Sequence, residues 1–265
     1  MAVMHLSIAF QPIVRLGGGE VVGHEALLRG PAPPDVLFAQ AEREGRLGAF
    51  DASVWRLAIA ASAAQGGARG RLFLNVDSRA LDDGGAEARI AALASELRLA
   101  GVSPSTIVLE LSENAPTIGT DAGARFAVTA GALGFGVALD DLGAGHASLA
   151  ALARVRPGIV KIDRGLVHGL DGDRLRRELV AAIVGFAQRA GMELIAEGIE
   201  TWAELEALRS IGVTLGQGFL LGRPAERMCA LAPATAERVV AASPKRSRAA
   251  PRRESAMLGV YRLVG

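Results

Sequence analysis

The chain has 265 residues, of which 50% are hydrophobic, and its formal net charge at pH 7 is +1. This balance of charge argues against a general nucleic-acid binder, and the longest apolar runs are well short of the roughly 20 residues of a transmembrane helix. The only cysteine, Cys229, excludes an intrachain disulfide and favours a reducing, cytoplasmic setting.

The charge is unevenly distributed along the chain. Residues 243–265 contain six basic residues against one acid, Glu254, so this segment carries +5 and the preceding 242 residues carry −4. We therefore expect one domain over residues 1–242 and a basic, disordered tail over 243–265. A membrane-surface or nucleic-acid contact is the alternative interpretation of the tail.

Apolar runs rich in Val, Ile, Leu and Phe predict eight strands. These strands are expected at residues 8–14, 21–28, 71–76, 106–111, 136–140, 158–162, 193–196 and 213–217. Helical patterns are expected at residues 36–47, 51–65, 86–100, 121–133, 147–154, 172–190, 202–210 and 224–241. Asp171 and Thr201 stand where helix N-caps would stand, and Gly191 where a helix would stop. Alternating strands and helices favour parallel pairing in a closed or doubly wound sheet.

The connection between the first two strands breaks this pattern. It consists of a short segment around Gly17, Gly18, Gly19 and Glu20, whereas a parallel crossover needs a dozen residues or more. The first strand should therefore run antiparallel to the second. Since a barrel of this kind needs about 250 residues, we predict an α/β fold, a TIM-like (β/α)8 barrel with an antiparallel first strand.

Polar groups end nearly every predicted strand. They are Glu25, Asn75, Glu110, Asp140 with Asp141, Lys161, Glu197 and Gln217. At one rim of a barrel these groups would converge, and the carboxylates would repel one another unless cations lay between them. Hard oxygen ligands select Mg²⁺ or Mn²⁺. Lys161 is one of only two lysines in the chain and lies inside an apolar run, which suggests a site that needs a compact ammonium group.

Asp140 and Asp141 are adjacent, and neighbouring side chains on a strand point to opposite faces. Where the backbone turns at the end of a strand, both could serve a pair of ions. Two ions about 4 Å apart would activate a water and receive a phosphodiester oxygen. Each residue also has an ordinary explanation: a solvated loop position for a lone Glu, a helix cap or turn for the aspartates, and a snorkelling surface position for Lys161. The hypothesis depends on their occurrence together, in order.

Eight segments in order make the chain resemble the EAL family of bacterial cyclic-di-GMP phosphodiesterases over residues 6–230. The first four are Phe10-Gln11-Pro12-Ile13-Val14, Gly23-His24-Glu25-Ala26-Leu27-Leu28-Arg29, Leu74-Asn75-Val76 and Leu109-Glu110-Leu111-Ser112-Glu113. The others are Asp140-Asp141-Leu142-Gly143-Ala144-Gly145, Val160-Lys161-Ile162-Asp163, Ile195-Ala196-Glu197-Gly198-Ile199-Glu200 and Gly216-Gln217-Gly218-Phe219.

The resemblance implies a barrel with a reversed first strand, and hydrolysis of cyclic-di-GMP to linear pGpG with two Mg²⁺ or Mn²⁺ ions. It assigns metal binding to Glu25, Asn75, Glu110, Asp140 and Asp141, and catalytic roles to Glu197, Lys161 and Gln217. It assigns substrate binding to Gln11, Leu27 and Arg29, and anchoring of the loop after the fifth strand to Glu113. A homodimer is a further expectation.

This sequence departs from the family pattern in the loop after the fifth strand. Leu142, Ala144, His146 and Ala147 stand where the family has Phe, Thr, Tyr and Ser, and Gly30 replaces a Trp. The loss of an aromatic ring and two hydroxyls motivates an alternative, a weakly active or inactive receptor or protein-interaction module. A third hypothesis is an unrelated metal-dependent barrel enzyme, such as a lyase.

Overall fold

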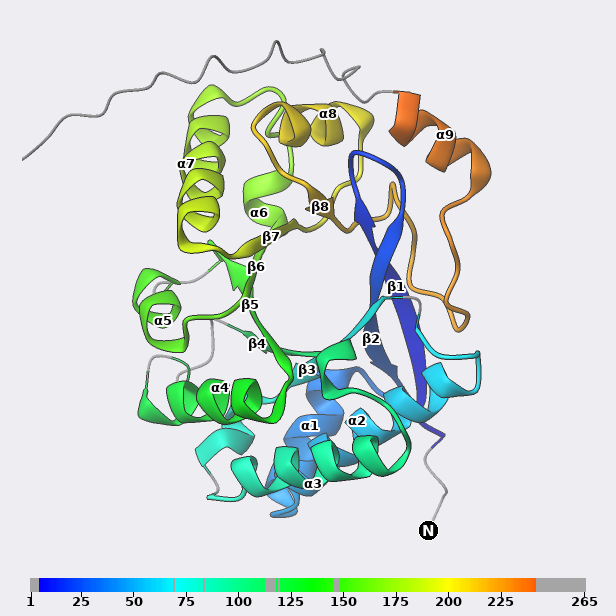
Figure 1. Cartoon of the computed structure of the whole chain (residues 1–265), viewed down its shortest axis with the longest axis vertical. Helices are drawn as coiled ribbons and strands as arrows, with labels where there is room; N and C mark the ends of the chain where they lie inside the picture. The colour runs from blue at the N-terminus through cyan, green and yellow to red at the C-terminus, as the bar shows by residue number, and fades with distance from the viewer. Residues whose placement is uncertain are drawn as a thin grey trace, which may run out of the picture.

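The computed structural model describes residues 5–68, 70–82, 84–112, 118, 120–144 and 148–241. Eight strands form a closed barrel in the order β1 to β8, with helices around its outside (Figure 1). The strands are β1 Ser7–Arg15, β2 Val21–Arg29, β3 Arg71–Val76, β4 Ile107–Ser112, β5 Gly136–Leu142, β6 Ile159–Ile162, β7 Glu193–Ala196 and β8 Leu215–Gly216. β1 is antiparallel to both of its neighbours, β2 and β8, whereas the pairs from β2 to β8 are parallel. The predicted barrel with a reversed first strand is therefore confirmed.

The α-helices are α1 Pro34–Arg43, α2 Leu47–Ala63, α3 Ala86–Leu99, α4 Asp121–Leu133, α5 Ser148–Val155, α6 Arg164–Val167, α7 Arg174–Ala190, α8 Trp202–Ser210 and α9 Pro233–Ala241. Thr201 caps α8 in a capping box with Glu204, and Gly191 ends α7 in the left-handed conformation, as predicted. Asp171 was predicted as the N-cap of α7, and this was wrong. The N-cap is Asp173, whose side chain accepts a hydrogen bond from the backbone N–H of Arg176.

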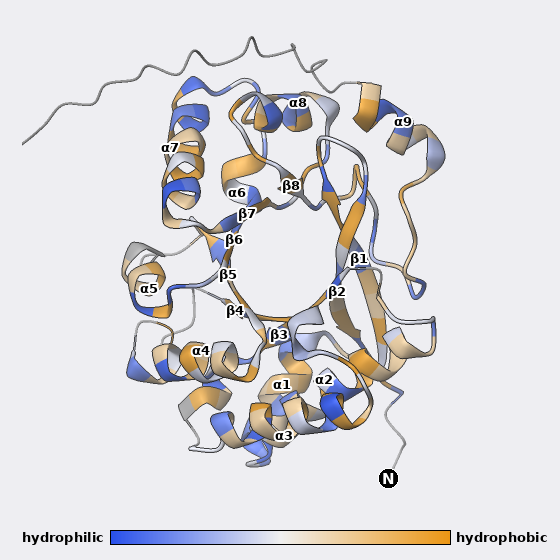
Figure 2. Ribbon diagram, viewed as in Figure 1, coloured by the Kyte–Doolittle hydropathy of each residue, from blue (hydrophilic) through white to orange (hydrophobic). Residues whose placement is uncertain are grey.

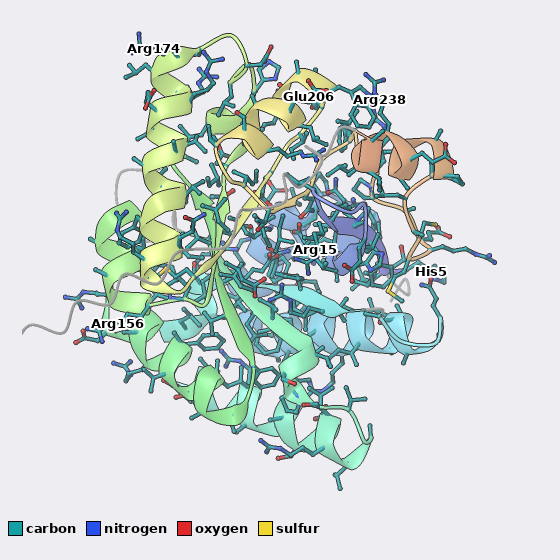
Figure 3. All side chains as sticks on the ribbon, turned by 45° about the horizontal axis from the view of Figure 1, so that its top comes forward. His5, Arg15, Arg156, Arg174, Glu206 and Arg238 are labelled. Atoms are coloured by element: carbon teal, nitrogen blue, oxygen red, sulfur yellow. The ribbon has the colours of Figure 1, made fainter. Side chains whose placement is uncertain are left out.

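The last helix is shorter than the predicted 224–241. Residues before Pro233 form a strap along β1 instead, because Ala225 exchanges both backbone hydrogen bonds with Phe10. α9 then packs beside α8, where the guanidinium of Arg238 lies 4.2 Å from the ring centroid of Trp202 (Figure 3). The predicted tail lies outside the described residues.

One layer of apolar side chains fills the inside of the barrel. Its members are Ile13, Phe73, Val108, Ala138, Ile159, Ile195 and Leu215. Gly23 belongs to the same level, where a Cβ atom would lie 2.9 Å from the Phe73 ring and 2.6 Å from the Arg71 carbonyl oxygen. The missing side chain of Gly23 therefore gives Phe73 its space, and the layer forms the floor beneath the polar groups at the rim.

Candidate active site

The polar groups at the rim lie within or directly after the strands that carry this apolar floor. Asn75, Glu110, Asp140, Lys161, Glu197 and Gln217 each lie two positions after a floor residue, and Glu25 lies two positions after Gly23. Because side chains along a strand alternate between its two faces, a spacing of two puts each polar group on the inner face. Glu25 was expected at a strand end, although the strand predicted at 21–28 already ran past it. In the structure Glu25 lies in the middle of β2, where it pairs with Gln11 of β1.

A buried ammonium group lies at the centre of the site. Lys161 Nζ is 2.7 Å from Glu197 Oε1 and 2.8 Å from Glu110 Oε1. It is also 3.2 Å from Asp140 Oδ1 and 3.4 Å from Glu25 Oε2. The Lys161 side chain has no solvent exposure. A single cation therefore neutralises one of the four carboxylates around it and leaves an excess of negative charge.

Burial and the neighbouring carboxylates shift the pKa values of these acids. Burial raises the pKa of Glu110 and of Glu197 well above the usual value for Glu, and Lys161 only partly offsets it. Burial likewise raises the pKa of Asp140. Burial alone would lower the pKa of Lys161, but the attraction of four carboxylates raises it well above its usual value. The site therefore holds its charges at a cost that a further cation would relieve.

Amide side chains hold Glu25 in place. Its Oε1 accepts a hydrogen bond from Asn75 Nδ2 at 3.0 Å, and its Oε2 accepts one from Gln217 Nε2 at 2.7 Å. Burial alone would raise the pKa of Glu25, but Lys161 and these amides lower it below its usual value. The Gln217 amide also reaches Gln11 Oε1 at 3.0 Å. Glu25 is therefore an ionised carboxylate in a fixed orientation.

The two adjacent aspartates reach the same site because β5 contains a bulge. Leu139 pairs with Val160 and Leu142 with Ile162, so β5 uses one residue more than β6 between these points. Asp141 takes up the extra residue with a φ of 62°. Carboxylate oxygens of Asp140, Asp141 and Glu197 consequently lie within 4.8 Å of one another.

The donor set fits a hard divalent cation. The groups at the rim offer carboxylate and amide oxygens, the ligands that Mg²⁺ and Mn²⁺ prefer. Both carboxylate oxygens of Glu110 are buried, and neither accepts a well-formed hydrogen bond within the described residues, although Lys161 lies close to Oε1. Gln217 Oε1 is also buried and accepts no hydrogen bond from the described residues. Such buried acceptors are costly unless a donor or a cation completes them.

Clefts lie on both sides of Glu25. One, of about 230 Å³, is lined by Gln11, Arg164, Glu197, Glu200 and Phe219 among others. The other, of about 310 Å³, lies over β2 and is lined by Leu27, Arg29, Phe38 and Trp55 among others. Glu25 lines both clefts. The predicted substrate residues are thus on the walls of these two clefts, Gln11 in the first and Leu27 with Arg29 in the second. The Gln11 amide also donates a hydrogen bond to the Gly222 carbonyl oxygen.

Three residues that sequence reasoning did not single out support the site. The Trp55 indole donates to the carbonyl oxygen of Asn75 at 2.9 Å, from α2 to β3. Arg164 pairs with Glu200 at 3.0 Å across the segment that carries Glu197. Gly198 makes room for that arginine, since a Cβ atom would lie 2.5 Å from Arg164 Cγ, and its φ is +67°. Nothing in the local sequence indicates these contacts, which come from tertiary packing.

Glu204 fixes the end of the same segment. The residue is 1% exposed, and its carboxylate accepts hydrogen bonds from the backbone N–H groups of Gly169, Glu200 and Thr201. The bonds join the end of α6 to the start of α8. The predicted loop anchor Glu113 lies outside the described residues, as do His146 and Ala147.

Comparisons with known proteins agree with this fold and site. The EAL domain profile matches residues 2–224. The chain belongs to the EAL domain family. It is 32% identical over 240 residues to the bifunctional diguanylate cyclase/cyclic di-GMP phosphodiesterase MucR of Pseudomonas aeruginosa, an alignment that covers 83% of this chain and 33% of that protein. The chain thus spans about a third of the length of this relative.

Solved structures give the same result. The manganese/cy-diGMP complex of Klebsiella pneumoniae BlrP1 superposes with a TM-score of 0.76 at 29% identity, covering 85% of this chain and 57% of that one. The c-di-GMP complex of the PaMucR phosphodiesterase superposes with a TM-score of 0.73 at 30% identity, covering 83% and 96%. Within the described ranges, no helix has the length and apolar character that crossing a bilayer requires.

Proposed function

We propose that this protein hydrolyses cyclic-di-GMP to linear pGpG with two Mg²⁺ or Mn²⁺ ions. The observation that carries the proposal is the convergence of four carboxylates on the buried Lys161 at the rim of the barrel. Binding of a dinucleotide alone needs neither so many acids nor a buried ammonium among them. The excess negative charge suits divalent cations, and so does the Glu110 carboxylate, whose buried oxygens accept no well-formed hydrogen bond from the described residues.

In this proposal Glu25, Asn75, Glu110 and Asp140 hold one ion, and Asp141 favours the second. When bound, the ions lower the pKa of a water and offset charge on the phosphodiester. Glu197 orients that water or accepts its proton, because it is partly exposed and lines the cleft beside the other carboxylates. Lys161 supplies a fixed positive charge near the phosphate.

The extended shape of the site suits a molecule with two bases. Glu25 lines both clefts, so a phosphodiester placed there would have room for a base on either side. In one cleft Phe219, 47% exposed, offers a ring face beside the Arg164–Glu200 pair. In the other, Leu27 would contact a guanine and Arg29 a phosphate.

The competing proposal is a receptor or interaction module without turnover, motivated by the altered loop after β5. One observation favours the enzyme over the receptor. Leu142, which replaces the family phenylalanine, is 4% exposed and packs in the hydrophobic core. This substitution therefore keeps the apolar anchor of the bulge that presents Asp141.

The test is to incubate purified protein with cyclic-di-GMP and Mn²⁺ and to measure pGpG by chromatography. We expect turnover by the wild type and at least a 100-fold loss in Glu25→Ala, since a metal ligand is lost. Glu20→Ala is a matched control, because Glu20 lies on the far side of the β1–β2 hairpin in an exposed pair with Arg15. Tight binding of cyclic-di-GMP without any pGpG would favour the receptor instead.

A homodimer in the cytoplasm is part of the same proposal. On α7 the exposed residues Leu175, Leu179 and Phe186 form a stripe with Ala182, and Figure 2 shows hydrophobic and hydrophilic residues sharing this helix. Their spacing is the same in both directions along the helix. Two antiparallel copies would therefore set Leu175 of one against Phe186 of the other, as a two-fold interface requires.

One pair of opposite charges suits the same arrangement of two copies. It would bring Arg189 of one α7 near Asp171, just before the start of the other α7. Arg174, at the outer end of α7 (Figure 3), would lie outside the apolar stripe. A second copy of this chain is thus the occupant that suits both the stripe and its flanks.

A further inference from the structure

The bulge in β5 creates a specific difficulty for Asp141. Its φ of 62° is in the left-handed region, where a non-glycine residue is strained. Asp141 has to stay in this conformation, because a regular strand would direct its side chain away from Asp140. Some neighbouring group must therefore compensate for the strain and orient the carboxylate.

Two contacts hold the backbone of Asp141. Its N–H donates to Asp140 Oδ1 at 2.9 Å. Its carbonyl oxygen accepts from the N–H of Ala144 at 3.0 Å, which closes a turn. These contacts fix the direction of the chain, but they leave the Asp141 side chain free to rotate about χ1.

One hydrogen bond to the described residues orients that side chain. The hydroxyl of Ser112, the last residue of β4, donates to Asp141 Oδ2 at 2.9 Å. Ser112 is paired with Asp140 in the parallel ladder, so the sheet itself fixes its position. A hydrogen bond to an ionised carboxylate is about twice as strong as one between neutral groups. It occupies one oxygen of Asp141, and the other accepts no hydrogen bond from the described residues.

We propose that Ser112 is a positioning residue that holds the Asp141 carboxylate ready for the second of two divalent cations. The inference rests on the proposed function, since it concerns the same site. Ser112 does not touch the ion or the substrate in this assignment. It acts through Asp141, and it supplies from β4 a side-chain hydroxyl, which Ala144 in the altered loop lacks.

Calorimetric titration with Mn²⁺ alone tests this inference without turnover. We expect two sites in the wild type, and in Ser112→Ala an unchanged first site with a second site weakened about 10- to 100-fold, as for other groups that orient metal ligands. Ser112→Thr keeps the hydroxyl and should retain both sites. Ser95→Ala, which removes a serine hydroxyl bonded to Ala91 O on an exposed part of α3, is the matched control.

A double-mutant cycle separates positioning from a general structural effect. In Asp141→Asn the second site should already be weak, and adding Ser112→Ala should change it no further. Circular dichroism melting of each variant without metal checks the fold, and Ser112→Thr keeps the test decisive if Ser112→Ala is unstable. Two unchanged sites in a folded Ser112→Ala, or a single site in the wild type, would overturn the inference. A wild type that binds no Mn²⁺ would overturn the proposed function as well.

Discussion

Lys161 Nζ and Glu110 Oε1 lie 2.8 Å apart, and both side chains are completely buried. Taking two such charges out of water is expensive, and the pair repays the cost only through its further contacts. Here the further contacts of Lys161 are three more carboxylates, which also need a cation. In the metal-free protein the ammonium group therefore holds these acids together. Lys161 therefore has a structural role as well as the proposed catalytic one.

We expect Lys161→Met to lower the stability of the metal-free protein by about 3–5 kcal/mol, because it leaves buried carboxylates without their cation. Added Mn²⁺ should then raise the melting temperature of the variant more than that of the wild type, since metal replaces the lost charge. Thermal melting with and without Mn²⁺ measures both effects. An equal Mn²⁺ shift in both proteins would contradict the prediction.

Lys161→Arg is the matched comparison for that variant. It keeps the positive charge but replaces a compact ammonium with a larger planar group. The nearest carboxylate oxygens lie 2.7 and 2.8 Å from the buried ammonium, so a larger guanidinium would displace them from their present positions. We expect the rate of pGpG formation to fall at least 100-fold with the fold retained.

Calcium should compete with Mn²⁺ without supporting turnover. Ca²⁺ takes 6–8 oxygen ligands at about 2.3–2.6 Å in flexible geometry, whereas Mg²⁺ demands a tighter octahedral arrangement. An assay at fixed Mn²⁺ with rising Ca²⁺ should show loss of pGpG that excess Mn²⁺ restores. Turnover with Ca²⁺ alone would argue against the proposed geometry.

Glu204 should make stability depend on pH. Burial alone would raise its pKa, but the backbone N–H groups of Glu200, Gly169 and Thr201 lower it below the usual 4.5. Since the folded value is below the unfolded one, the ionised carboxylate stabilises the fold above pH 4.5. This contribution is lost as the pH falls through the folded value.

Glu204→Gln should therefore cost about 1–3 kcal/mol near neutral pH and much less at about pH 3.5. Urea unfolding at the two pH values measures the difference. Glu206→Gln, an exposed change on the same helix, is the control and should have little effect at either pH. A cost for Glu204→Gln that does not change with pH would show that shape, rather than charge, is what matters.

The apolar stripe on α7 predicts a dimer that a single charge disrupts. Leu179→Arg puts a cation in the middle of the stripe, where Leu179 is 49% exposed, so the folded monomer should tolerate it. We expect light scattering after size exclusion to give a dimer for the wild type and a monomer for the variant. Leu99→Arg, a change of a 90% exposed leucine on α3, should leave the dimer intact. A monomeric wild type would contradict the proposal.

The barrel could be predicted because local and long-range signals agree in this chain. The short connection at Gly17–Gly19 forces β1 to run antiparallel, and each apolar run ends near a polar group. The register within the β1–β2 hairpin was less accessible. Ile13 pairs with Gly23 and Gln11 with Glu25, so Glu25 is an interior strand residue and not a terminal one.

The supporting contacts of the site were harder to predict than its acids. The acids follow their floor residues by two positions, which is a local pattern. Trp55, Arg164 and Ser112 act through partners on other elements. The first two pairs depend on how helices pack against the barrel, and the third depends on the alignment of β4 with β5. The bulge at Asp141 shows in the pairing of β5 with β6, which the sequence of β5 alone does not indicate.

The chain has only two tryptophans, and one of them, Trp55, is bonded through its indole N–H to the backbone of Asn75. Its emission is therefore an intrinsic optical probe of the rim of the barrel. Replacing Trp202 by phenylalanine would leave Trp55 as the single tryptophan, and occupancy of the neighbouring cleft could then be followed in real time without any label.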